Sequence, residues 1–188
     1  TGGGYSKWQG QEINRWRSDR TCDQWGNYCY IHDLRERDVW SATFHPMAGD
    51  YSDYSAEFAL DRAIFRRRKN DIQLETEVIV APEDDVEIRR MTFINRSVQR
   101  RRLNLTSYIE LSMALHAADR AHPAFNKLFI ETEALEEERT LLAYRRPRSE
   151  DATPFFVAHR FVNGQEGTPR WNFVTDRYRF IGRSEEHT

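Results

Sequence analysis

Alternation of apolar and polar residues between positions 72 and 80 is the feature that most restricts the folds open to this chain. In the segment Ile-Gln-Leu-Glu-Thr-Glu-Val-Ile-Val, every second side chain from Ile72 onward is apolar or threonine, and those between are mostly Gln or Glu. A period of two places successive side chains on opposite faces of a β-strand, whereas a helix repeats about every 3.6 residues. Pro82-Glu83-Asp84-Asp85 follows, with the chemistry of a tight turn. The segment therefore predicts a strand of a β-sheet.

The same period recurs along the chain, and turn residues separate the segments at intervals of about ten residues. Two strands are expected directly after the first, through 86–94 and 103–111. Further strands are expected at 27–32, 39–44, 57–60, 63–67, 127–135, 140–146, 155–162 and 171–175. Residues 112–119 are expected to form a short helical turn. The predicted fold is all-β, an antiparallel β-sandwich of many strands in a single domain.

Composition excludes several classes of protein. The chain has 188 residues, of which 39% are hydrophobic and 31% charged, so it is long enough for one core and too apolar to be disordered. The net charge is −2, with Arg and Asp/Glu interspersed, which argues against a nucleic-acid partner. No apolar run approaches the roughly 20 residues of a membrane helix, and no signal peptide is visible. Cys22 and Cys29 are expected to be free thiols in a reducing compartment, with a disulfide across a hairpin as the alternative.

Basic clusters stand at 66–69, 89–90, 100–102 and 145–148, each near acidic residues. We expect them to be solvated strand ends and turns that prevent edge-to-edge aggregation. No metal-ligand spacing, phosphate-binding loop or Ser-His-Asp pattern is visible. Asp84 and Asp85 are paired carboxylates, but they sit in a turn without aromatic neighbours. The sequence thus predicts no catalytic residue and no metal site.

Aromatic, basic and glycine residues are concentrated at the start of the chain. The segments are Thr-Gly-Gly-Gly-Tyr-Ser-Lys-Trp at 1–8, Asn-Arg-Trp-Arg-Ser-Asp at 14–19 and Trp-Gly-Asn-Tyr at 25–28. Glycines allow close backbone approach, and aromatic rings beside Arg and Asn suit the apolar face and hydroxyls of a sugar. Trp40 is expected in the core, whereas Trp8 and Trp16 fit either a core or a sugar-facing position. Arg15 and Arg17 fit either ion pairs with Asp19 or hydroxyl binding.

A second motif is Ala-Ala-Asp-Arg-Ala-His-Pro-Ala-Phe-Asn-Lys at 117–127. We expect a long loop between two apolar strands, and such loops often carry binding residues. His122 is therefore a candidate for substrate or partner contact. The alternative is that His122-Pro123 is a rigid turn and Phe125 fills the core.

These motifs, in this order, resemble the N-terminal β-supersandwich domain of the cellobiose-phosphorylase-type glycoside phosphorylases, the former glycosyltransferase family 36, whose fold is galactose-mutarotase-like. The resemblance extends to about Gly182, with further matches at 39–42, 80–85, 105–108, 127–133, 145–149 and 175–177. The 117–127 motif and Arg-Arg-Pro-Arg-Ser at 145–149 favour the branch that contains the cyclic β-1,2-glucan synthases. Asn126 departs from the pattern, because the family usually has Ser there.

The resemblance implies a larger protein in which the sandwich precedes an (α/α)6 barrel. The barrel carries a general-acid Asp, and inorganic phosphate attacks the anomeric carbon with inversion. No such barrel sequence occurs in these 188 residues, so the chain by itself is expected to be catalytically inert. Phosphate would be a co-substrate of the full-length protein, and no cofactor is implied.

The resemblance also implies contact with sugar and a role in dimerisation. By analogy, Tyr5 and Trp16 would stack a glucosyl ring, and the remaining substrate-binding residues would be Arg15, Arg17, His122 and Phe125. Arg15 and Arg17 would bind hydroxyls, and His122 and Phe125 would shape the rim. The expected partners are a β-glucan oligosaccharide, the downstream barrel and a second copy of the chain. The open alternatives are a stand-alone glucan-binding module and a purely structural dimerisation domain.

Residues 1–182 are expected to form the carbohydrate-binding sandwich. The last six, Arg-Ser-Glu-Glu-His-Thr at 183–188, read like a translated sequencing adapter, so we expect them to be non-native. The resemblance implies a bacterial cytoplasmic domain whose full-length protein is either soluble or anchored in the inner membrane.

Overall fold

A computed structural model describes residues 2–17, 25–49, 53–147, 154–162 and 170–180. The chain forms two compact units, Thr1–His116 and Ala117–Thr188. Every strand pair in the described residues is antiparallel, which confirms the predicted all-β antiparallel fold. Cys22, Asp19 and the tail 183–188 lie outside the described residues.

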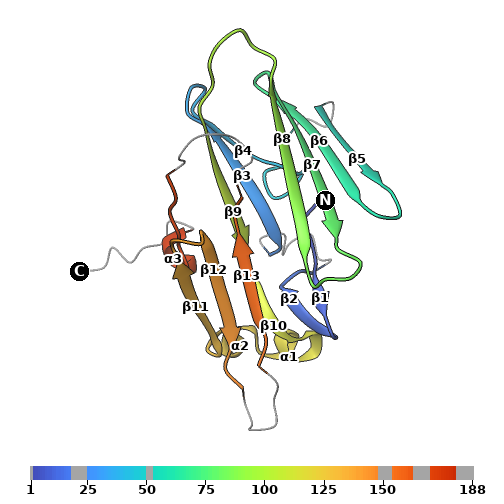
Figure 1. The fold of residues 1–188 in the computed structure, drawn as a ribbon, viewed down its shortest axis with the longest axis vertical. Helices are drawn as coiled ribbons and strands as arrows, with labels where there is room; N and C mark the ends of the chain where they lie inside the picture. The colour runs from blue at the N-terminus through green and yellow to red at the C-terminus, as the bar shows by residue number, and fades with distance from the viewer. Residues whose placement is uncertain (1, 18–24, 50–52, 148–153, 163–169, 181–188) are drawn as a thin grey trace, which may run out of the picture. The chain divides into compact units, whose positions relative to one another are not determined.

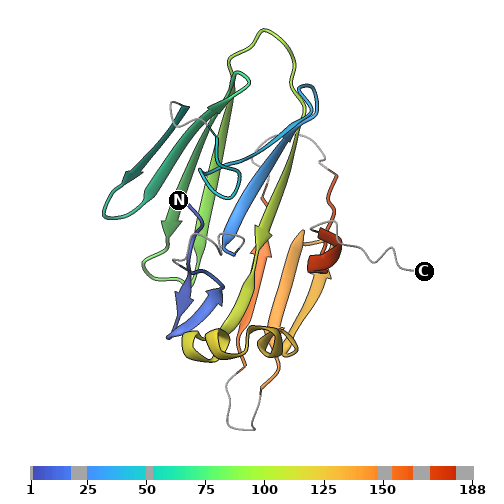
Figure 2. The same ribbon diagram turned by 180° about the vertical axis from the view of Figure 1, so that it is seen from behind.

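The described strands of the first unit form three sheets (Figures 1 and 2). The first sheet is short and has the order β1 (Lys7–Trp8), β2 (Gln11–Asn14), β10 (Leu111–Leu115). The second has the order β4 (Asp38–Ser41), β3 (Asn27–Asp33), β9 (Leu103–Ile109). The third has the order β5 (Tyr54–Phe58), β6 (Ala63–Lys69), β7 (Ile72–Val80), β8 (Glu87–Asn95).

The second and third sheets share one hydrophobic core. Its buried members come from β3, β4 and β7 and the residue after β4: Ile31, Trp40, Ala42, Ile72 and Leu74. The alternation in β7 therefore does what the sequence predicts, because Ile72 and Leu74 point into the core. Trp40 is only 2% exposed, as expected for a core residue.

The second unit contains one described sheet, with the order β11 (Ile130–Leu135), β12 (Thr140–Arg145), β13 (Phe156–Arg160). Three short helices accompany it in sequence: α1 (His116–Ala121), which spans the boundary between the units, α2 (Pro123–Lys127) and α3 (Arg177–Phe180).

Four local predictions are wrong in whole or in part. Residues 171–175 form no strand. Residues 111–115 are strand β10, and the helix begins only at His116. The expected loop at 117–127 is mostly helical, in α1 and α2. The expected strand through 103–111 is divided at Glu110, because the backbone N–H of Glu110 donates to the carbonyl of Gly26 and its own carbonyl accepts from Arg15 N–H, which takes the chain out of the second sheet.

The basic clusters are not uniformly solvated edges. Arg67 lies in β6, an interior strand, and is 6% exposed. Its guanidinium donates to the carbonyls of Ser41 and Thr43 at 2.8 Å and lies 5.9 Å from the Trp40 ring. Burial lowers the pKa of Arg67. Arg67 therefore holds the segment after β4 against the third sheet.

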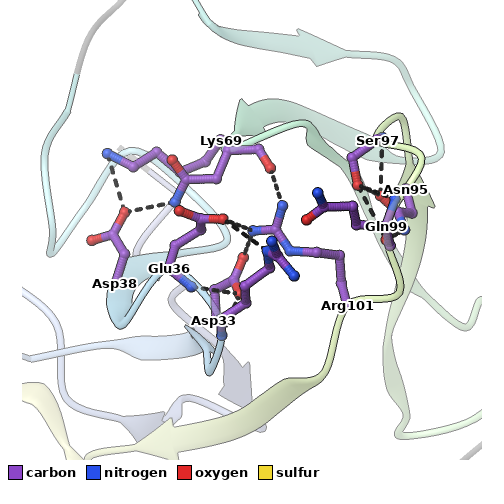
Figure 3. A network of polar contacts seen from close by, with 10 residues as sticks. Asp33, Glu36, Asp38, Lys69, Asn95, Ser97, Gln99 and Arg101 are labelled. Carbon is purple, nitrogen blue, oxygen red and sulfur yellow. Dashed lines mark hydrogen bonds and ion pairs between the residues drawn. The ribbon is translucent and has the colours of Figure 1, made fainter.

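Arg101 is also buried, and it ties together the loops at one end of the sandwich (Figure 3). Its guanidinium donates to the carboxylate of Asp33 and, at 2.8 Å, to the carbonyl of Asn70. Asn70 in turn donates to Asp38 at 3.0 Å. The network joins the β3–β4, β6–β7 and β8–β9 loops to one another, so its role is structural.

Candidate functional site

The site begins with a tight hairpin. Trp8 pairs with Gln11 and Lys7 with Glu12, leaving Gln9 and Gly10 as a two-residue turn. Both turn residues have positive φ, 46° for Gln9 and 81° for Gly10, which is the type I′ geometry that matches strand twist. The register places the side chains of Lys7 and Glu12 on the same face.

Glu12 is the centre of the site. It is fully buried, and its Oε1 accepts from the Tyr5 hydroxyl at 2.6 Å and contacts His116 Nδ1 at 2.5 Å. Its Oε2 accepts from Arg17 at 3.4 Å. Two neighbours from the start of the chain and one residue that is 104 positions away therefore meet at one carboxylate.

A bulge in β10 brings His116 to this carboxylate. The pairing of β10 with β2 shifts register between Leu111 and Ala114, where Met113 has a φ of 49°. After the bulge, Ala114 lies opposite Glu12 and Leu115 opposite Gln11. His116 follows Leu115 directly, so that its ring reaches Glu12.

The aromatic part of the site is partly exposed. Tyr5 is 38% exposed, and its ring centroid lies 5.8 Å from that of Trp16 at an interplanar angle of 42°. The Lys7 ammonium lies 5.5 Å from the Tyr5 ring. Burial and the hydrogen bond to Glu12 raise the pKa of Tyr5 to about 12, so the phenol is neutral and its proton is committed to Glu12.

Arg15 occupies a supporting position. It is 2% exposed, and its guanidinium pairs with the Glu110 carboxylate at 3.2 Å. Glu110 also accepts from the Tyr108 hydroxyl. The Arg15 and Arg17 guanidinium carbons lie 5.1 and 5.7 Å from the Trp25 ring. Arg15 therefore holds Trp25 and the backbone, whereas Arg17, which is 15% exposed, lies nearer to solvent.

The glycine cluster serves packing within the unit. A Cβ on Gly4, which has a φ of 62°, would lie 2.1 Å from the Arg89 guanidinium, and one on Gly26 would lie 2.4 Å from the Gly3 carbonyl. Asn14 donates to the Gly4 carbonyl at 2.9 Å, and its Oδ1 accepts from Ser6 N–H at 2.9 Å. These contacts fix the opening segment beside β2.

His122 and Phe125 belong to the second unit. His122 is exposed and precedes Pro123, the first residue of α2. Phe125 is 51% exposed and packs edge-on against Phe129 at 5.2 Å, so the alternative that it fills the core is wrong. Behind them, buried Asn126 donates to Asp119 at 3.4 Å and accepts from Arg145 at 3.0 Å.

Four predicted residues, Tyr5, Arg15, Trp16 and Arg17, thus gather in the first unit, and the other two lie in the second. Sequence reasoning missed the carboxylates that organise the first group, Glu12 and Glu110, and also His116. A polar strand residue such as Glu12 carries no local signal of burial, because its partners lie far away in sequence. Within the described ranges no three His, Cys, Asp or Glu side chains are grouped to hold a metal ion. None of the helices in the described part of the chain is long and apolar enough to span a membrane.

Comparison with known proteins gives one family. The supersandwich domain of glycosyl hydrolase 94 matches residues 1–188. The chain is 34% identical over 183 residues to the cyclic β-(1,2)-glucan synthase NdvB of Rhizobium meliloti (strain 1021), which is 97% of this chain and 6% of the synthase. It is 30% identical over 122 residues to the N,N′-diacetylchitobiose phosphorylase of Vibrio furnissii, and 31% identical over 117 residues to that of Vibrio proteolyticus. These matches cover 62% and 60% of this chain and 15% of each phosphorylase.

Proposed function

The chain belongs to the supersandwich-domain family of glycosyl hydrolase 94, and from this premise we propose that it binds β-linked glucan as part of a larger glucan-active protein. Its relatives are a cyclic β-(1,2)-glucan synthase and two N,N′-diacetylchitobiose phosphorylases, and the match to the synthase spans most of this chain. The proposed ligand is therefore a β-1,2-linked glucan. Inverting phosphorolysis or glycosyl transfer, with inorganic phosphate as co-substrate, would belong to the rest of that protein, in the bacterial cytoplasm.

The observation that carries the proposal is the partly exposed Tyr5–Trp16 pair beside charged groups. Two tilted rings with centroids 5.8 Å apart present apolar faces of the size of a pyranose. Arg17, at 15% exposure, can donate to adjacent hydroxyls. Glu12 and the buried Arg15–Glu110 pair fix these groups beforehand, which lowers the entropic cost of binding.

The candidate glucan-binding residues have different roles in this function. Tyr5 and Trp16 stack the ring, and Arg17 binds hydroxyls. Arg15 acts through Trp25 and the backbone because it is buried. His122 and Phe125, both exposed in the second unit, are assigned to glucan contact by the family resemblance alone.

Titration calorimetry with β-1,2-linked glucan oligosaccharides tests the proposal on the whole chain. Trp16→Ala is expected to weaken binding about tenfold or more, because a stacked aromatic face is worth roughly 1–2 kcal/mol. Val98→Ala is the control, since Val98 is a fully exposed apolar residue of the same unit that lies outside the site. Binding that is absent from the unmodified chain, or unchanged in Trp16→Ala, contradicts the proposal.

A second candidate function is self-association. It is favoured by strand β5, which lies at an edge of the third sheet, and by the highly exposed Phe58 and Leu60 at its end. An edge strand with exposed apolar residues is a template for pairing with another chain.

A further inference from the structure

We propose that His116 is a further glucan-contacting residue, and that Glu12 holds its ring in the tautomer that accepts a hydrogen bond from a sugar hydroxyl. This inference rests on the proposed function. It concerns a residue that neither the sequence motifs nor the family comparison singles out.

The first step is the assignment of the ring proton. His116 Nδ1 lies 2.5 Å from Glu12 Oε1, which also accepts from the Tyr5 hydroxyl. An ionised carboxylate can only accept hydrogen bonds. Nδ1 therefore carries a proton, and in the neutral ring Nε2 is an acceptor.

The second step is exposure. The Glu12 side chain is fully buried, whereas the His116 side chain is 46% exposed. A carboxylate that orients an imidazole from the protein side leaves the opposite nitrogen for a ligand, as in many metal and catalytic sites. Nε2 is thus the ring nitrogen available to solvent.

The third step is the chemistry of the groups around the His116 ring. The titratable and charged groups that face Glu12 are Tyr5, Lys7, Arg17 and His116. Lys7 and Arg17 only donate hydrogen bonds, and the Tyr5 proton is committed to Glu12. A sugar hydroxyl both donates and accepts; the Tyr5 oxygen keeps lone pairs that can accept, and His116 Nε2 adds a second acceptor beside it.

The fourth step is proximity to the stacking ring. The Tyr5 hydroxyl and His116 Nδ1 both lie within 2.6 Å of the same Glu12 oxygen. The two rings are therefore neighbours, and a pyranose stacked on Tyr5 or Trp16 would bring its hydroxyl edge to Nε2.

The test compares variants of the whole chain by calorimetry with β-1,2-linked glucan oligosaccharides. His116→Asn places an amide N–H near the Nδ1 position, so it can still donate to Glu12, but it has no counterpart of Nε2. We expect about a tenfold loss of affinity, the equivalent of one hydrogen bond to an otherwise unpaired group. Glu83→Gln, in the exposed turn after β7, is the control and should bind as the unmodified chain does.

The tautomer is measured separately by long-range ¹⁵N–¹H NMR of the His116 ring. We expect the Nδ1–H form in the unmodified chain and loss of that preference in Glu12→Gln, whose amide can donate as well as accept. Tight glucan binding by His116→Asn, or an Nε2–H ring in the unmodified chain, overturns the inference and leaves the proposed function intact. Absence of glucan binding by the unmodified chain overturns the proposed function and this inference together.

Discussion

At the scale of single residues, the clearest consequence of the site is the behaviour of Tyr5 at high pH. Burial and Glu12 raise its pKa from its ordinary value of 10.0 to about 12. A raised folded-state pKa adds stability that is fully present below the ordinary value and is lost as the pH rises through the folded value. We expect the unfolding free energy of the unmodified chain to exceed that of Tyr5→Phe at neutral pH, and the gap to narrow between about pH 10 and 12.

Urea unfolding of both proteins over this pH range measures the gap. Cys29 and the other tyrosines with raised pKa values, Tyr30, Tyr54 and Tyr144, are common to both proteins and cancel in the comparison. A gap that stays constant with pH would show that the phenol proton is not held by Glu12.

The buried ion pair of Arg101 and Asp33 gives a second prediction at this scale. Removing one partner of a buried pair costs about 3 kcal/mol, because the other charge stays buried without compensation. Arg101→Ala is therefore expected to lower the unfolding free energy by about that amount. Arg68→Ala removes an exposed pair with Asp71, both 56% exposed, and should cost about 0.5 kcal/mol or less.

The same pair has a pH signature. Burial alone would raise the pKa of Asp33, but the hydrogen bonds from Arg101 and from the backbone N–H groups of Glu36 and Arg35 outweigh burial and lower it. The pair therefore stabilises the fold above the ordinary carboxyl range and loses this effect as the pH falls below that range. Equal losses in Arg101→Ala and Arg68→Ala, or a difference that does not shrink on acidification, would contradict this account.

At the scale of elements, the β1–β2 hairpin offers a stability change of known sign. Gln9 has a φ of 46°, and Asn adopts that conformation more readily, so Gln9→Asn creates the favoured Asn-Gly turn. We expect a gain of about 0.5 kcal/mol from this change. Gly10 has a φ of 81° and open space around it, so Gly10→Ala tests backbone strain alone and should cost about 1 kcal/mol. Thermal unfolding measures the stability of both variants. If both changes stabilised the chain, or both destabilised it, a type I′ turn would be excluded.

The elements differ in how well they can be predicted from the sequence. Strand β7 was predictable to the residue because its sequence alternates over nine residues, and burial follows that alternation from Ile72 to Thr76. Strands β1 and β2 were not predictable, because they are two and four residues long and their turn is Gln-Gly. Residues 171–175 alternate in composition but form no strand, since composition does not specify a pairing partner.

The candidate site also has a part that could be predicted from the sequence and a part that could not. The aromatic and basic residues at its rim are visible in the sequence because they cluster within the first 17 positions. Its organising contacts are not visible, because Glu12 and His116 are 104 residues apart, and Arg15 and Glu110 are 95 residues apart. Local patterns cannot show which buried carboxylate meets which cation.

At the scale of the whole molecule, self-association is open to a direct test. Among the described strands β5 pairs only with β6, and the highly exposed Phe58 and Leu60 lie at its end and just beyond it. Lysine on an edge strand blocks pairing with another chain, because the charge would have to be buried against the partner. We expect the unmodified chain to sediment as a concentration-dependent mixture of monomer and dimer, and Phe58→Lys with Leu60→Lys to shift it to monomer.

The control for this experiment is Val98→Lys, which adds a charge at an equally exposed apolar residue in the connection between β8 and β9, away from the β5 edge. It should leave the sedimentation profile unchanged, because the added charge lies away from the proposed interface. An unchanged profile shows that net charge alone does not cause the shift to monomer. A monomer at every concentration, or the same shift in Val98→Lys, would remove the β5 edge as an interface. Because Phe58 and Leu60 lie outside the Tyr5–Trp16 site, a monomeric double variant that still binds glucan would also show that assembly and sugar binding are separate properties of the domain.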